Sequence, residues 1–78
     1  MQRSPSLSFE DGNVALLAGQ CYFLVHRGFL SRHSEYLAER TRDNGSYTAM
    51  TLEGRPVLHL PDSPDDISLL LHWMYDGL

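Results

Sequence analysis

The sequence predicts an α+β domain in which a small sheet is flanked by two short helices and one longer helix. Two short apolar runs, separated by a tight connection, lie near the N-terminal end of the chain. Farther along, apolar residues recur at helical spacing, and a well-marked amphipathic segment ends the chain. Strand-length apolar runs kept apart from helical segments are typical of this fold class.

The composition fits one small globular domain. The chain has 78 residues, of which 42% are hydrophobic and 10% aromatic, so general disorder is not expected. A folded chain of this length buries only about 60% of the surface that its unfolded form exposes, which predicts a thin core. The net charge is −4, and the six basic residues are all arginines scattered along the chain. Because they form no basic stripe, we expect no binding to nucleic acid.

The single cysteine, Cys21, indicates a reducing environment. It excludes a disulfide within the chain and a zinc site built on several cysteines. A small domain without disulfides fits an intracellular protein, cytoplasmic or nuclear. No apolar run approaches the ~18 residues that a membrane span needs, so we expect no contact with a membrane.

The strands are expected in the first third of the chain and again after residue 56. Residues 1–8 are polar and include a proline, and we interpret them as a disordered leader that precedes a domain at 9–78. The runs VALLA (14–18) and CYFLV (21–25) are two residues apart, which predicts adjacent antiparallel strands. Neither run alternates with polar residues, so both faces of this hairpin should be covered. A third strand is expected at 57–60.

Two short helices and a loop are expected between these strands. From Gly28 onward the apolar residues take a helical period. Ser34 followed by Glu35 is typical of an N-cap with an acid in the first turn, so we expect two short helices that break near Ser34. Residues 41–56 are polar and rich in turn formers, and we interpret them as a long surface loop.

The best-marked element is a helix at 64–76. Ser63 can act as its N-cap, Pro64 fits its first position, and Gly77 supplies a C-terminal stop. An apolar stripe at i, i+3, i+4 and i+7 should face the sheet, and two further apolar residues broaden it. The stripe consists of Ile67, Leu70, Leu71 and Met74, and the broadening residues are Leu69 and Trp73.

Candidate catalytic and metal-binding groups are few. The four histidines, at 26, 33, 59 and 72, lack metal-binding spacing and no HExxH motif is present, so we expect no metal and no cofactor. Cys21 lies in an apolar strand, where a thiolate is disfavoured, and no GxSxG motif marks a nucleophilic serine. The neighbouring Asp65 and Asp66 are explained by the positive helix start. Without a set of groups that a reaction needs, the sequence does not indicate an enzyme.

His26 and Arg27 stand where the apolar run 21–25 meets the first helical segment. Such a pair could be a catalytic dyad, a ligand pair or a structural hinge between strand and helix. The residues alone leave these three alternatives open.

Two blocks of the sequence resemble the BTB/POZ domain, in particular the large fungal group of that family. The blocks are NVALLAGQCYFLVHRGFLSRHSEYL and GRPVLHLPDSPDDISLLLHWMYDG, and the resemblance covers residues 9–78. In the first block the family positions are Phe23, His26, Arg27, Leu30, Ser34 and Tyr36. In the second block they are Leu58, Leu60, Asp62, Tyr75 and Gly77.

The resemblance implies a non-catalytic protein–protein interaction module that binds a protein partner or forms a homodimer. It implies that His26 and Arg27 mark the strand-to-helix junction, with His26 holding the junction and Arg27 near a dimer-facing pocket. The interface residues that we expect are Phe9, Asn13, Arg27, Leu30, Leu69 and Trp73.

The sequence departs from the family pattern in two ways. An aspartate that the family often has at the start of the first strand is Asn13 here, so an aspartate–arginine pocket becomes an asparagine–arginine one. The family also continues with another strand and several helices, so we expect this chain to be an N-terminal part of the domain. Two alternative functions stay open: an adaptor fragment of a cullin-type ubiquitin ligase, and a truncated product without independent function.

Overall fold

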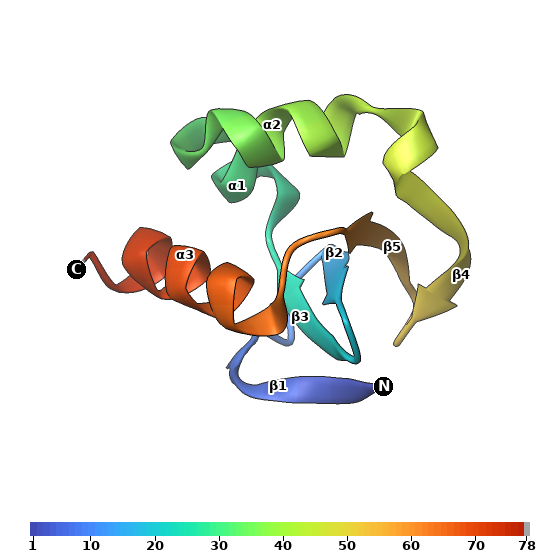
Figure 1. Ribbon diagram of the computed structural model, residues 1–78, viewed down its shortest axis with the longest axis horizontal. Coiled ribbons are helices and arrows are strands. Elements are labelled where there is room, and N and C mark those ends of the chain that lie inside the picture. Colours follow the sequence, from blue (N-terminus) through green and yellow to red (C-terminus); the bar gives the residue numbers. More distant parts are fainter. Residues whose placement is uncertain (78) are drawn as a thin grey trace.

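Five strands and three helices make up the computed structural model, which describes residues 1–77. The strands are β1 (Gln2–Ser8), β2 (Val14–Ala18), β3 (Cys21–Val25), β4 (Tyr47–Leu52) and β5 (Arg55–Leu60). The helices are α1 (Arg27–His33), α2 (Glu35–Arg42) and α3 (Pro64–Asp76), with a short 3-10 turn, η1 (Asn44–Ser46). The strands form one mixed sheet in the order β1-β3-β2-β5-β4, which confirms the predicted α+β class (Figure 1).

The central hairpin agrees with its prediction. Strands β2 and β3 pair antiparallel from Val14↔Val25 to Ala18↔Cys21, with a two-residue connection between them. Gly19 in this connection has φ of +60°, a conformation that glycine adopts without steric cost. All five residues of β2 are buried, so both faces of this strand are covered as expected.

The predicted long loop at 41–56 is wrong, because most of this segment is regular structure. Helix α2 continues to Arg42, and Tyr47–Leu52 forms strand β4, which pairs antiparallel with β5. Glu53 and Gly54 join the two strands with φ of 50° and 78°. Positive φ at both central residues is the geometry of a type I′ hairpin turn. The turn formers in this segment therefore mark a hairpin rather than an irregular loop.

The disordered leader expected at 1–8 is a strand instead. Strand β1 pairs parallel with β3, and Leu7 enters the core with 2% of its surface exposed. Because β1 is an edge strand, Pro5 is tolerated there. The Ser8 hydroxyl donates to the Ser4 carbonyl at 2.7 Å, which satisfies a backbone group at the register shift. The polar composition of β1 reflects its position at the sheet edge, not disorder.

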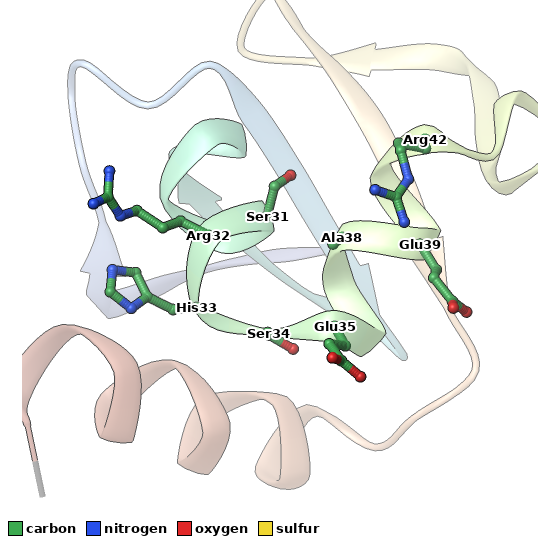
Figure 2. Close-up of a pocket in the computed structure, with 8 residues that line it drawn as sticks. All are labelled: Ser31, Arg32, His33, Ser34, Glu35, Ala38, Glu39 and Arg42. Carbon is green, nitrogen blue, oxygen red and sulfur yellow. The ribbon is translucent and has the colours of Figure 1, made fainter.

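The two short helices break where the sequence predicts. The Ser34 hydroxyl accepts a hydrogen bond from the Leu37 N–H at 3.2 Å and so caps α2. Between α1 and α2 lies an open hollow of about 540 Å³. Its lining side chains carry both signs of charge, and Figure 2 shows that they point in different directions rather than toward one centre. They are Ser31, Arg32, His33, Ser34, Glu35, Ala38, Glu39 and Arg42.

Helix α3 has the predicted bounds and the predicted orientation. The Ser63 hydroxyl accepts from the Asp66 N–H, and Gly77 ends the helix in the left-handed conformation. Ile67 and Leu71 are buried, while Leu70 and Met74 are partly buried against the core. All three helices contribute to this core on one face of the sheet. Its fully buried helical members are Leu30, Leu37, Ile67 and Leu71.

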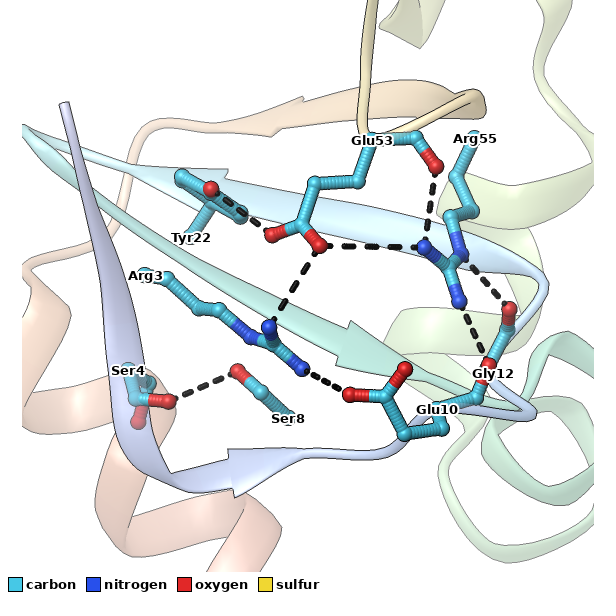
Figure 3. Close-up of polar contacts among 8 residues, drawn as sticks. All are labelled: Arg3, Ser4, Ser8, Glu10, Gly12, Tyr22, Glu53 and Arg55. Atoms are coloured by element: carbon cyan, nitrogen blue, oxygen red, sulfur yellow. Dashed lines mark hydrogen bonds and ion pairs between the residues drawn. The ribbon is translucent and has the colours of Figure 1, made fainter.

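The opposite face of the sheet has a second, smaller core that contains no helical residue. Its buried members are Ala15, Leu17, Leu24 and Val57, with Tyr22 and Leu52 packed against them. Four charged residues, which we call the arginine clasp, span this face from β1 to the β4–β5 turn (Figure 3). The clasp consists of Arg3, Glu10, Glu53 and Arg55.

The clasp joins segments from opposite ends of the strand order. Arg3 on β1 contacts Glu10 at 3.0 Å and Glu53 at 3.4 Å. Arg55 donates to the carbonyl oxygens of Gly12 at 2.9 Å, Glu10 at 2.6 Å and Glu53 at 2.9 Å. The guanidinium of Arg55 therefore satisfies three backbone acceptors at once. The side chains of the clasp cover the second core.

Candidate interaction surface

The strand-to-helix junction is built around His26, the single residue between the end of β3 and the start of α1. Its ring Nδ1 lies 3.0 Å from the Tyr75 hydroxyl, and its backbone N–H donates to the same hydroxyl at 3.1 Å. Its Nε2 lies 2.9 Å from the Asp11 carboxylate. A neutral ring protonated at Nε2 matches all three contacts, since Tyr75 then donates to Nδ1 and Nε2–H donates to Asp11. His26 thus fixes the last turn of α3 to the junction.

Aromatic rings surround this hydrogen-bonded junction. Tyr75 stacks on Phe9 with ring centroids 4.9 Å apart and packs against Phe29 at 4.3 Å. Phe29 also contacts the His33 ring at 4.4 Å. Burial raises the pKa of the Tyr75 hydroxyl above its ordinary value, which is already well above neutral pH, so the protonated hydroxyl can donate to the His26 ring. Phe9, one of the expected interface residues, is therefore half-buried within the junction.

The Asn13 side chain contacts the backbone of Arg27 and not its guanidinium. The Asn13 side-chain oxygen accepts from the Arg27 N–H at 2.8 Å, which caps α1 because His26 makes no side-chain cap of its own. The Arg27 guanidinium instead donates to the Thr41 carbonyl at 3.3 Å, near the end of α2. His26 and Arg27 thus have separate partners, and their contacts are those of a structural hinge.

The expectation that Leu30 belongs to an interface is wrong. Leu30 is completely buried in the main core, where it packs beneath α1. The neighbouring Phe29 is only partly buried. In a helix as short as α1, the sequence gives two adjacent apolar residues and no period long enough to tell which one points inward.

Hydrogen bonds made by two tyrosine hydroxyls connect the two sequence blocks. His26 of the first block bonds Tyr75 of the second, and Tyr36 of the first donates to Asp62 of the second at 2.5 Å. Burial and the bond to Asp62 raise the pKa of Tyr36. Three further motif residues have structural positions: Phe23 is buried, Ser34 caps α2 and Gly77 ends α3. The second block is thereby tied to the first at both ends of α3.

A Ser–His–Asp series, which the sequence alone does not indicate, connects β1 to α3. His72 Nδ1 lies 2.8 Å from the Asp76 carboxylate, and His72 Nε2 lies 3.4 Å from the Ser6 hydroxyl. A catalytic base and nucleophile approach within about 2.6–3.2 Å, usually in a shielded site. Here 34% of the His72 side chain and 57% of the Asp76 side chain are exposed. We interpret the series as a polar tether, and only the i, i+4 spacing of His72 and Asp76 could have been found in the sequence.

The outward side of α3 carries two of the three most exposed large apolar residues among residues 1–77, the third being Met1. Leu69 and Trp73 expose 67% and 54% of their surface and lie one helical turn apart. They broaden the stripe as the sequence predicts, but they point away from the core, opposite Ile67 and Leu71. Three exposed aspartates share this side, namely Asp65, Asp66 and Asp76. We call these five residues the α3 face: Asp65, Asp66, Leu69, Trp73 and Asp76.

A family model described as the BTB/POZ domain matches residues 6–78. The chain belongs to the BTB/POZ domain family. Proteins of this family are generally non-enzymatic modules for protein–protein interaction, which confirms the broad function that the sequence implies. No curated protein and no solved structure matches the chain. Within residues 1–77, no helix has both the length and the apolar character needed to cross a membrane.

Proposed function

We propose that this BTB/POZ chain is a non-catalytic, intracellular module that binds a protein partner through the α3 face. The observation that carries the proposal is the exposure of Leu69 and Trp73 on a helix whose other side is fixed in the core. Large aromatic residues are enriched at protein interfaces and often dominate their binding energy. A second copy of the chain and a cullin-type ligase are further candidate occupants of this face.

The surroundings of α3 support this proposal because they hold the face in one orientation. Ile67 and Leu71 anchor the inner side, Tyr75 bonds the junction, and His72 contacts Ser6 on β1. Side chains presented by a fixed helix lose little conformational entropy on binding.

Site-specific photo-crosslinking in cells that produce the protein tests this function. A photoreactive residue at position 69 should give a crosslinked protein of defined mass, and the additional substitution Trp73→Ala should remove it. Position 50 is the matched control, because Met50 is an exposed apolar residue on β4, with 37% of its surface exposed. Identical products from positions 69 and 50 would overturn the proposal.

A further inference from the structure

The α3 face combines apolar and acidic side chains on one arc of the helix. With about 3.6 residues per turn, positions 65, 69, 73 and 76 lie close to a single line, and position 66 lies beside it. The opposite positions, Ile67 and Leu71, are buried, which fixes this arc toward solvent. Leu69 and Trp73 are therefore bordered by carboxylates at both ends of the helix.

The charge of this face is not balanced by arginine. Residues 62–77 contain four aspartates and no arginine. Among residues 1–77, the ion pairs formed by arginine involve Glu10 and Glu53, on the far side of the sheet. Asp76 contacts His72, and Asp65 and Asp66 favour the helix start. The face thus presents up to three negative charges around two apolar side chains.

This charge distribution opposes pairing of the face with itself. In a symmetric antiparallel contact, Asp76 of one copy approaches the start of α3 in the other, where Asp65 and Asp66 lie. In a parallel contact each aspartate approaches its own counterpart. Either arrangement gathers six carboxylates around four apolar side chains, and like charges brought together across an interface oppose association.

We infer that the α3 face binds a basic amphipathic helix, in preference to a second copy of this chain. This inference rests on the proposed function, since it names the partner of the same face. Apolar residues of such a helix would pack across the ridge of Leu69 and Trp73, and its Arg or Lys side chains would meet the three aspartates. An arginine would also stack on the exposed indole of Trp73.

A pair of labelled helical peptides tests this inference with the full chain. Both carry two leucines one turn apart, and the flanking residues are arginines in one peptide and glutamates in the other. In fluorescence anisotropy, the arginine peptide should bind at least about tenfold more tightly than the glutamate peptide. Raising sodium chloride from about 0.05 to about 0.5 M should reduce this difference, because salt screens exposed charges.

Variants of the chain distinguish the local charge of the α3 face from the net charge of the whole chain. The triple substitution Asp65→Asn, Asp66→Asn and Asp76→Asn should weaken binding of the arginine peptide by about tenfold, as the loss of three exposed ion pairs implies. Asp76→Asn alone, which leaves the helix start intact, should weaken it by about twofold to threefold. The matched control replaces Glu35, Glu39 and Asp43 by their amides and should leave the affinity unchanged. These three acids lie in or next to α2.

The outcomes distinguish this inference from the proposed function. Equal binding of both peptides, lost in Trp73→Ala, would overturn the basic preference and leave the α3 face as an interface. Weak binding of both peptides, or an equal loss in the control variant, would overturn the inference as well. Sedimentation adds an independent measurement: the triple variant should self-associate at lower concentration than the natural chain. A Trp73-dependent dimer of the natural chain at low salt would contradict the inference.

Discussion

Single hydrogen bonds decide how the last helix is attached to the rest of the domain. The Tyr75 hydroxyl both accepts from the His26 backbone N–H and bonds the His26 ring, while its own ring packs on Phe9. Sequence similarity marks His26 and Tyr75 as motif positions, but it does not say that they touch. Their contact depends on the path of the chain between residues 27 and 74, which no local pattern specifies.

Removal of the Tyr75 hydroxyl should destabilise the domain while the ring packing is kept. In Tyr75→Phe, the His26 backbone N–H and ring Nδ1 lose their partner in a half-buried site, so the free energy of unfolding should fall by about 1–3 kcal/mol. Urea denaturation measures this change. Tyr22→Phe is the matched control, since its hydroxyl bonds Glu53 on the exposed surface and its loss should cost clearly less. Equal losses would show that the junction bond is not special.

The contact between Asp11 and His26 should make the free energy of unfolding depend on pH in the acidic range. The hydrogen bond from His26 holds the pKa of Asp11 below its ordinary value of 3.8. A carboxyl whose pKa is lower in the folded state stabilises the protein above its unfolded-state pKa, and this contribution disappears as the pH falls through the folded-state value. The stability difference between the natural chain and Asp11→Asn should therefore shrink below about pH 4. Thermal unfolding at several pH values measures it, and a constant difference would contradict the account.

At the scale of elements, local patterns predict the buried strands and the capped helices but not the edge strands. The bounds of β2, β3 and α3 follow from apolar runs and from capping residues such as Ser63 and Gly77. Strands β1 and β4 were missed because edge strands keep many side chains in water and so lack a clear apolar period. Leu30 was misplaced for a related reason, since α1 has only seven residues.

The two sides of α3 should respond very differently to truncation. Leu71→Ala removes a fully buried side chain and should lower the free energy of unfolding by about 2–5 kcal/mol. Leu69→Ala, two positions away on the exposed side, should change it by less than about 0.5 kcal/mol. Both variants keep a good helix former, so urea denaturation reports burial rather than helix propensity. Similar losses in the two variants would mean that the outer side is also packed.

At the scale of the whole molecule, the arginine clasp covers a face of the sheet that the helices leave free. The sequence indicates no role for Arg3 or Arg55, because their contacts join segments about fifty residues apart in the chain. A charged residue in a turn or strand gives no indication of which distant carbonyl it will meet. Of the second core beneath the clasp, the sequence predicts only that both faces of the hairpin formed by β2 and β3 are covered.

Loss of Arg55 should weaken the whole fold. Its guanidinium donates to three carbonyl oxygens and only 18% of the side chain is exposed, so Arg55→Met should lower the free energy of unfolding by about 2–3 kcal/mol. Arg42→Met, on the exposed end of α2, is the matched control and should have little effect. Calorimetry of both variants measures the shift in melting temperature. An unchanged melting temperature in Arg55→Met would show that the second core is stable without the clasp.

The attachment of β1 has a consequence for the order in which the domain opens. Leu7 is its one deeply buried apolar side chain, and its other anchors are the Arg3 contacts and the tether from Ser6 to His72. Strand β2, by contrast, is paired on both sides and buried throughout. Segments held by few buried contacts open with a smaller free energy than the global unfolding of the chain. Backbone amides that bond across β1 and β3 should therefore exchange with deuterated water before those between β2 and β5, while the three helices stay folded.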